Sequence, residues 1–247
     1  MYQYQPPAEL LKDKVILVTG ASDGIGAAVA KAYARHGATV ILHGRKVEKL
    51  EAIYDEIVAK GGPQPAILPL DLQSAAQQQY QSLAETIGKE LGRLDGVLHN
   101  AAMISELTPI EFTEVNVWHE MMQVNLNSVF MLTQACMPLL REAPTASIIT
   151  TSSGVGKKGR AFWGPYAVSK FAIEGFTQVL ADELEGSNIR VNAINPGATR
   201  TRMRATAFPA EDASRLISPS ELENLYLYLM GEDSADIHGQ SIDAQPK

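Results

Sequence analysis

The feature that most constrains the fold is an alternation of short apolar, β-rich runs with longer segments whose apolar residues recur every three or four positions. The β-rich runs lie at 15–19, 38–42, 65–70, 94–100, 146–152 and 189–195, with a shorter one near 239–244. Parallel strands need helix-length crossovers between them, and strands that are apolar throughout are covered on both faces. The pattern predicts the α/β class: one doubly wound parallel sheet of about seven strands with helices on both faces.

The chain of 247 residues contains no internal repeat, low-complexity tract or linker that would divide it. We expect residues 1–12 to form a short N-terminal extension and residues 13–247 to form a single domain. The beginning of the chain lacks the basic and apolar regions of a signal peptide, and no apolar run is long enough to cross a bilayer. We therefore expect a cytoplasmic protein without a membrane partner.

Charge and cysteine content disfavour two other classes of protein. The net charge is -7, so no excess of Lys and Arg exists to meet the phosphates of a nucleic acid. The only cysteine, Cys136, lies in an apolar run and is expected in the core. The net charge therefore predicts no nucleic-acid partner. Because no cluster of Cys and His residues has the spacing of a zinc site, we also expect no metal.

A glycine-rich turn, Gly20-Ala21-Ser22-Asp23-Gly24-Ile25-Gly26, joins the first β-rich run to the first helical segment. Glycines at such a junction allow a tight turn and let the backbone approach a pyrophosphate, which then lies at the helix N-terminus. A glycine-rich turn can also be purely structural. Its place at the first strand–helix junction favours binding of a dinucleotide.

The end of the second β-rich run reads His43-Gly44-Arg45-Lys46 and carries no carboxylate for the ribose hydroxyls of NAD. Gly44 leaves room for a 2′-phosphate, and the guanidinium of Arg45 suits one. These residues favour NADP(H), although NAD(H) stays open and Arg45 could instead be a solvated residue at a helix start. Asp23 opposes the preference, since its charge would repel the added phosphate unless it points away.

Tyr166 and Lys170 lie one helical turn apart at the start of the segment after the fifth β-rich run. This spacing alone arises easily by chance. In the expected fold, however, the pair would lie beside the carboxyl ends of the strands, where ligands of open α/β sheets bind.

Taken together, these motifs resemble the short-chain dehydrogenase/reductase family. Ser153 lies thirteen residues before Tyr166, Asn125 lies in MMQVNLNSVF, and Pro196–Thr201 resembles the element that holds the nicotinamide in that family. The resemblance covers about residues 13–245, implies a Rossmann-like fold, and in detail is greatest to the YciK-type bacterial oxidoreductases.

The resemblance implies that Tyr166 is the general acid/base of hydride transfer between NADP(H) and a carbonyl or secondary alcohol. Lys170 would lower the high pKa of the phenol and bind the nicotinamide ribose. Ser153 would hydrogen-bond the substrate oxygen, with Ser152 as the alternative donor. Asn125 would hold a water that links Lys170 to solvent. A catalytically silent NADP(H)-binding sensor or scaffold is the alternative interpretation.

By the same resemblance, Asp71 would bond the adenine amino group, with Leu72 against the ring. The segment 95–102 resembles a family element but has His99 where the family has Asn and Ala102 where it has Gly. We expect His99 to be a hydrogen-bonded core residue. The complete set of expected cofactor-binding residues is Gly20, Ser22, Asp23, Gly24, Ile25, Gly26, Arg45, Asp71, Leu72, Asn100, Tyr166, Lys170, Pro196, Gly197, Thr199 and Thr201.

The substrate is expected to be small and largely apolar, because bulky residues gather near the expected mouth of the site. Ser153, Trp163 and Met203 are the candidate contacts. The irregular segment after Pro196, of about twenty residues, is expected to be an active-site lid. Basic clusters at 157–160 and 200–204 would attract an anionic substrate or shield the cofactor phosphates, or simply form solvated loops.

Family precedent implies a homodimer or homotetramer. The segments 112–141 and 164–185 are the expected contact faces, and they are rich in Ala, Leu and Met. Apart from other copies of the chain, the expected partner is a small-molecule carbonyl or alcohol.

Overall fold

Strand β1 (Val15–Thr19) lies inside the sheet and is buried throughout, as its mainly apolar sequence predicts. The computed structural model describes residues 4–246 and contains a 7-stranded sheet in the order β3-β2-β1-β4-β5-β6-β7, with every neighbouring pair parallel. The other strands are β2 (Thr39–Gly44), β3 (Ala66–Pro69), β4 (Gly96–His99), β5 (Ala146–Thr151), β6 (Ile189–Asn195) and β7 (Ser241–Asp243). The predicted doubly wound parallel sheet is confirmed.

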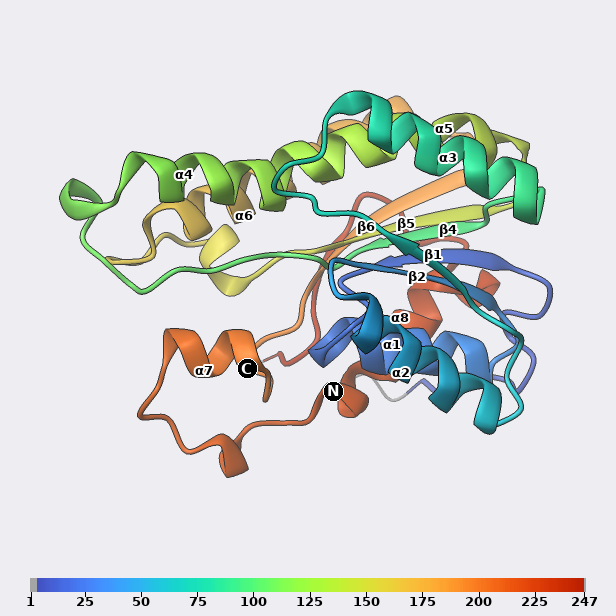
Figure 1. Ribbon diagram of the computed structural model, residues 1–247, viewed down its shortest axis with the longest axis horizontal. Helices are drawn as coiled ribbons and strands as arrows, with labels where there is room; N and C mark the ends of the chain where they lie inside the picture. Colours follow the sequence, from blue (N-terminus) through green and yellow to red (C-terminus); the bar gives the residue numbers. More distant parts are fainter. Residues whose placement is uncertain (1–3, 247) are drawn as a thin grey trace.

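Helices cover both faces of this sheet (Figure 1). One apolar core packs the sheet against α1 (Gly24–Arg35), α2 (Val47–Ala59) and α8 (Glu223–Met230). A second core on the opposite face packs it against α3 (Gln77–Leu91), α5 (Ser128–Glu142) and α6 (Gly164–Glu183). Cys136 is fully buried in this second core, as expected.

The chain enters the sheet at its centre, so β1 has β2 on one side and β4 on the other. The crossovers after β1 and after β3 therefore run in opposite directions across the sheet. Loops at the carboxyl ends of β1 and β4 diverge at this switch point, which leaves a crevice for a ligand. The topology alone thus places the candidate site.

The segment expected as one long helix at 112–141 is divided in the structure. Helix α4 (Val115–Met122) is followed by a π-helical turn (Gln123–Asn127) and then by α5. A π-turn inside a helix widens it by one residue and is common at functional sites. Asn125, one of the expected catalytic residues, lies in this turn and is buried.

The segment after Pro196 contains a short helix, α7 (Arg202–Ala207), within the stretch expected to be irregular. Thr201 caps this helix by accepting a hydrogen bond from the Arg204 amide at 3.2 Å. The segment is closed at its base, where Thr199 forms an isolated bridge with Ile217 and the Arg200 amide donates to the Ile217 carbonyl at 2.8 Å. We call residues 199–217 the lid segment.

Residues 4–12 pack against the domain. Leu11 is fully buried in the core that contains α1, and its amide donates to the His36 carbonyl at 2.9 Å. No helix within residues 4–246 is long and apolar enough to cross a membrane.

Candidate active site

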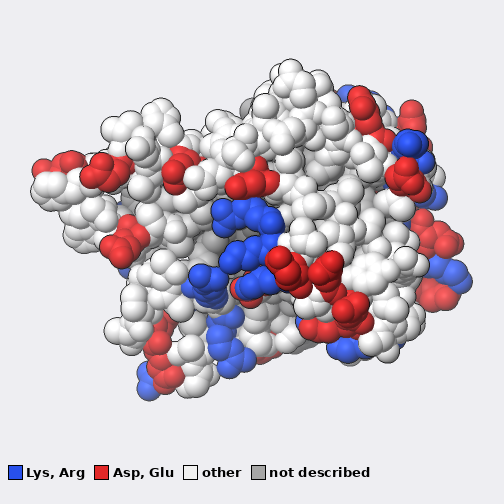
Figure 2. Space-filling model, in the orientation of Figure 1, with Lys and Arg blue, Asp and Glu red and all other residues white. Residues whose placement is uncertain are grey.

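A cavity of about 370 Å³ opens at the carboxyl end of the sheet, between the strand ends and the lid segment. Figure 2 shows Lys and Arg side chains gathered around a hollow at the middle of this face, although the net charge of the chain is -7. Of the expected site residues, all except Gly26 and Asn125 line the cavity. Those that do are Gly20, Ser22, Asp23, Gly24, Ile25, Arg45, Asp71, Leu72, Asn100, Ser153, Trp163, Tyr166, Lys170, Pro196, Gly197, Thr199, Thr201 and Met203.

The glycine-rich turn forms one wall of the cavity. Gly20 adopts a φ of 67°, in the left-handed region that favours glycine. A Cβ atom on Gly26 would lie 2.2 Å from the Gly20 carbonyl oxygen, so only glycine lets the turn close onto the helix. Gly26 therefore shapes the wall without lining it. The turn places the N-terminus of α1 at the cavity wall, where a helix terminus favours an anion such as a pyrophosphate.

Asp23 lines the cavity, and two contacts offset its negative charge. Its Oδ1 accepts a hydrogen bond from the Gly24 amide at 2.7 Å and caps α1. Its Oδ2 lies 3.5 Å from the Nζ of Lys49 on α2. The helix N-terminus and the ammonium both offset the carboxylate charge. The repulsion that the Asp23 carboxylate would exert on the 2′-phosphate of NADP(H) is thereby reduced.

The expected adenine end lies across the cavity from Tyr166. Asp71 accepts a hydrogen bond from the Gln73 amide at 3.1 Å, and its Oδ1 lies 3.9 Å from a guanidinium nitrogen of Arg45. Asn100 donates from its side chain to the Thr19 carbonyl at 3.2 Å, which ties β4 to β1 beside the turn. The glycine-rich turn at the N-terminus of α1 and the adjacent guanidinium of Arg45 together fit a phosphorylated dinucleotide.

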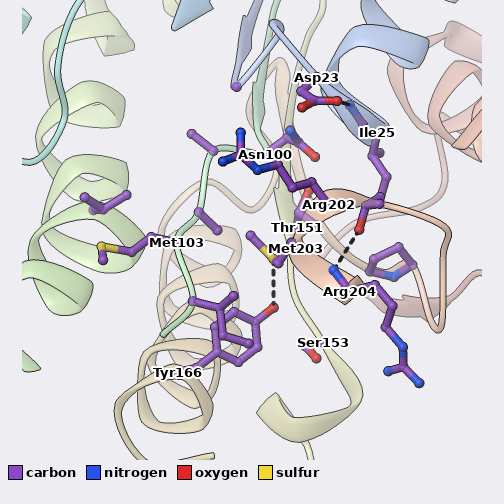
Figure 3. A pocket seen from close by; sticks show the side chains of 18 of the residues that line it. Asp23, Ile25, Asn100, Met103, Thr151, Ser153, Tyr166, Arg202, Met203 and Arg204 are labelled. Carbon is purple, nitrogen blue, oxygen red and sulfur yellow. Dashed lines mark hydrogen bonds between the residues drawn. The ribbon is translucent and has the colours of Figure 1, made fainter. Parts of the chain in front are cut away.

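Tyr166, Ser153 and Lys170 converge at the other end of the cavity. Figure 3 shows Tyr166 and Ser153 facing the same space, with Met203 opposite the phenol. The phenol of Tyr166 lies 3.9 Å from the Met203 sulfur. The Lys170 ammonium lies 5.7 Å from the centre of the Tyr166 ring and donates to the Thr151 carbonyl at 2.7 Å.

Burial shifts the pKa of both Tyr166 and Lys170 toward their uncharged forms. It raises the pKa of Tyr166 to about 12, and a hydrogen bond with Ser153 opposes this only in part. The direction is opposite to the lowering expected from Lys170, because desolvation outweighs the favourable contacts of the phenolate. Burial also lowers the pKa of Lys170 to about 8, while the charge of nearby Glu174 works against the shift. Near neutral pH the phenol is protonated and can donate.

Ser152 and Ser153 have different surroundings. The Ser152 hydroxyl is buried and donates to the Glu174 carboxylate, which also accepts from Ser241 at 2.9 Å. The Ser153 hydroxyl is half-buried and interacts with the Tyr166 phenol. These contacts favour Ser153 over Ser152 as the donor to a substrate oxygen.

Asn125 does not reach the cavity. Its side chain accepts from the Met103 amide at 2.8 Å and donates to the Met103 carbonyl at 3.0 Å. It also donates to the Ser169 hydroxyl at 3.1 Å, and Ser169 donates to the Tyr166 carbonyl at 2.8 Å. Asn125 thus connects the loop after β4 to the first turn of α6, which carries Tyr166.

The mouth of the cavity is apolar and aromatic. The Trp163 ring lies 5.7 Å from the ring centres of both Tyr166 and Phe208. Within the lid segment, Arg204 forms two 2.6 Å hydrogen bonds with Glu211, and its guanidinium lies 3.9 Å from the centre of the Phe208 ring. A second hollow beside Tyr166 is lined mainly by apolar side chains, among them Ile104, Leu107, Phe112, Val117, Phe162, Trp163 and Pro165.

The two basic clusters differ in their contacts. Lys157 pairs with Asp243 at 2.9 Å, so part of the 157–160 cluster holds β7 rather than a ligand. Arg202 and Arg204 both line the cavity. Arg204 is held by Glu211, whereas Arg202 forms no ion pair with any residue of the described range 4–246. Only part of the basic charge near the mouth is therefore free to meet an anion.

His99 is a buried residue of the sheet and does not line the cavity. It bonds the Thr133 hydroxyl at 2.9 Å, as expected for a core histidine, and burial lowers its pKa to about 3. Across residues 4–246, no group of three or more His, Cys, Asp or Glu side chains could hold a metal ion.

Lys49 and the π-helical turn are not predicted from the sequence. Nothing in the sequence around Lys49 indicates its contact with Asp23, because the two residues belong to separate elements. The π-turn has no composition that separates it from an ordinary helix. Thr201, by contrast, stands three residues before Arg204 as a capping residue, and this signal is present in the sequence.

Comparison with known proteins identifies the family of the chain. Residues 14–212 match the family model described as short chain dehydrogenase. The chain is 52% identical over 243 residues to the oxidoreductase YciK of Escherichia coli strain K12, covering 98% of this chain and 96% of that protein.

Solved structures give the same result. A short chain dehydrogenase from Shigella flexneri, in complex with NADP, is 51% identical with a TM-score of 0.95, covering 97% of this chain and 100% of that one. One from Escherichia coli CFT073, in complex with NADPH, is 52% identical with a TM-score of 0.95, covering 98% and 100%. The chain belongs to the short-chain dehydrogenase/reductase family of oxidoreductases, as the resemblance implied, and is similar to its YciK-type members.

Proposed function

We propose that the chain is an NADP(H)-dependent oxidoreductase that interconverts a carbonyl and a secondary alcohol, with Tyr166 as the general acid/base. The observation that carries this proposal is the convergence of the protonated Tyr166 phenol, the Ser153 hydroxyl and the Lys170 ammonium in one buried corner of the cavity. A protein that only binds the dinucleotide has no need of this arrangement.

When bound, NADPH supplies the hydride that the carbonyl carbon accepts. Ser153 and Tyr166 hold the carbonyl oxygen by hydrogen bonds and stabilise the negative charge that develops on it. The Tyr166 proton passes to that oxygen and completes the alcohol. Lys170 offsets the charge left on the phenolate, and in the reverse direction the phenolate takes the proton back.

The proposed preference for NADP(H) is supported by Gly44, Arg45 and the Asp23–Lys49 pair. Arg45 is exposed beside the cavity, and its only charged partner within residues 4–246 is Asp71, at the long distance of 3.9 Å. Arg45→Ala should weaken NADPH binding about tenfold and leave NADH binding nearly unchanged, since only NADPH carries the added phosphate. A wild-type preference for NADH would reject the proposed specificity.

The proposed substrate is small and largely apolar. The support is the wall of Trp163, Met203 and Phe208 around the Tyr166 phenol, together with the apolar hollow beside it. Turnover of a carbonyl library with NADPH would define the substrate class.

The deciding experiment is Tyr166→Phe. We expect turnover to fall by a factor of about 10²–10⁴ while NADPH binding, measured by calorimetry, stays within about threefold of wild type. Loss of binding together with turnover would indicate a structural role for the phenol. Undiminished turnover, or a wild-type protein that binds NADPH without turning over any carbonyl, would favour the silent binding protein.

We also propose that the chain assembles as a homodimer or homotetramer in the cytoplasm. Large apolar side chains on α5 and α6, namely Phe130, Val168, Phe171 and Val179, are each at least 42% exposed. Burial of such side chains between copies would remove them from water. Light scattering of wild type and Phe171→Glu tests this, with a smaller assembly expected for the variant.

A further inference from the structure

His43 is a buried histidine for which the catalytic proposal gives no role. It lies near the carboxyl end of β2 and is 1% exposed. Neither of its ring nitrogens has a hydrogen-bond partner among residues 4–246. The residue lines the cavity that holds the candidate active site. Buried polar groups in native proteins are nearly always paired, so two unpaired nitrogens on one ring call for an explanation.

The side chain lies on a definite face of the sheet. Along β2, Leu42 belongs to the core with α1 and α8, whereas Ile41 belongs to the core with α3 and α5. Side chains alternate along a strand, so His43 shares the face of Ile41. Leu72, which also lines the cavity, belongs to the same core.

The register places His43 at the nucleotide end of the cavity. It is paired with Thr19 of β1 on one side and with Leu68 of β3 on the other. β3 leads into Asp71 and Leu72, the residues expected at the adenine. Tyr166 and Ser153 belong to α6 and the end of β5, on the other side of β1 in the strand order.

The ring is uncharged near neutral pH, because burial lowers the pKa of His43 to about 4. A neutral imidazole carries one N–H donor and one nitrogen acceptor. The adenine of a nucleotide offers both an amino donor and ring-nitrogen acceptors on its edge. The chemistry of His43 therefore complements that of a purine and offers nothing specific to a phosphate.

Tyr80 on α3 shows that an unpaired buried group alone is not sufficient. Its hydroxyl also has no hydrogen-bond partner within residues 4–246, and its ring belongs to the same core as Leu72. Tyr80 does not line the cavity. His43 differs from Tyr80 because the residue lines the cavity, although its unpaired ring nitrogens are themselves buried.

We propose that His43 is a cofactor-binding residue that hydrogen-bonds the adenosine half of the dinucleotide. The proposal rests on the nucleotide cofactor of the proposed function and is independent of its hydride-transfer chemistry.

The test is calorimetric binding of 2′,5′-ADP to the full chain, which requires no turnover. His43→Leu replaces the ring with an apolar side chain and should weaken binding of 2′,5′-ADP about tenfold, while the unliganded variant melts at or above the wild-type temperature. Nicotinamide mononucleotide should bind the variant as it binds wild type. Tyr80→Phe is the matched control: it removes a second unpaired buried group, one outside the cavity lining, and should leave binding unchanged.

Equal affinity of wild type and His43→Leu for 2′,5′-ADP would overturn the inference and leave His43 as a core residue. If His43→Leu does not fold, the ring ¹⁵N resonances of the wild-type histidine, assigned with His43→Gln, decide the question. They should shift with 2′,5′-ADP and not with nicotinamide mononucleotide; no shift with either would reject the role. Failure of wild type to bind 2′,5′-ADP would instead reject the proposed cofactor, and binding without turnover would reject only the proposed chemistry.

Discussion

The nucleotide end and the mouth of the cavity are built from different parts of the chain. At the nucleotide end, backbone atoms and short side chains form the wall, and Gly26, Asp23 and Asn100 are each held by immediate neighbours in the sheet or in α1. At the mouth, long side chains of the lid segment contact one another, as in the Arg204–Glu211 and Arg204–Phe208 pairs. The first region tolerates little change in shape, while the second can change its side chains without moving a strand.

Among the changes that compare these two regions, the largest expected effect comes from adding one methyl group to the rigid region. Gly26→Ala places a Cβ 2.2 Å from the Gly20 carbonyl oxygen and 2.6 Å from the Asn100 amide nitrogen, so the turn must open. Overpacking costs about 1–3 kcal/mol. We expect dinucleotide binding to weaken by up to about a hundredfold, measured by calorimetry, with a lower melting temperature.

Gly175→Ala in α6 is the matched control, because a Cβ added to Gly175 would meet no atom of another element within 4 Å. This variant should bind the dinucleotide as wild type does and be slightly more stable, since alanine favours a helix over glycine. Unchanged binding by Gly26→Ala would show that the turn is less rigid than its geometry indicates.

A smaller effect concerns pH and compares the nucleotide end with the end of the cavity that holds Tyr166. Lys170, beside Tyr166, has a pKa lowered to about 8, so its ammonium is present below that pH and is lost above it. For carbonyl reduction we expect kcat/KM to decrease above about pH 8, approaching tenfold per pH unit. Binding of 2′,5′-ADP, which does not reach Lys170, should stay flat between about pH 7.5 and 9.5.

The inflection should be absent from the residual activity of Lys170→Met. Persistence of the same inflection in that variant would assign it to another group. An equal pH dependence of fragment binding and turnover would show that the two regions are electrostatically linked.

The smallest effect concerns the lid segment alone. Glu211→Gln removes the charge that holds Arg204 in a pair whose side chains are partly exposed, so the loss is about 1 kcal/mol or less. We expect KM for the carbonyl substrate to rise about two- to fivefold and dinucleotide affinity to stay constant. Steady-state kinetics together with calorimetry would check both; a larger change in dinucleotide affinity than in KM would contradict the division into two regions.

The sequence indicated most residues that line the nucleotide end of the cavity, because their determinants are local. The glycine turn, Arg45 and the strand ends are each recognised from a few consecutive residues, and the strand pattern places them at one edge of the sheet. Tyr166, Ser153 and Lys170 likewise follow from the ends of neighbouring elements.

What the sequence did not reveal depends on contacts between distant residues. The burial that raises the pKa of Tyr166, the salt bridge from Lys49 to Asp23 and the unpaired ring of His43 arise only when separate elements pack together. The side chain of Asn125, in the π-helical turn, likewise bonds Met103 and Ser169, at sequence distances of 22 and 44 residues.

The bridge between Thr199 and Ile217 has an evolutionary consequence. Because the two ends of the lid segment are joined to each other, the residues between Thr201, an expected cofactor contact, and Ile217 form a loop that can be replaced as one unit. Insertions or exchanges there would alter which molecules are accepted while β6 and the sheet beside it keep their places. A family can diversify its substrates by changes in such a loop while the cofactor and the reaction stay the same.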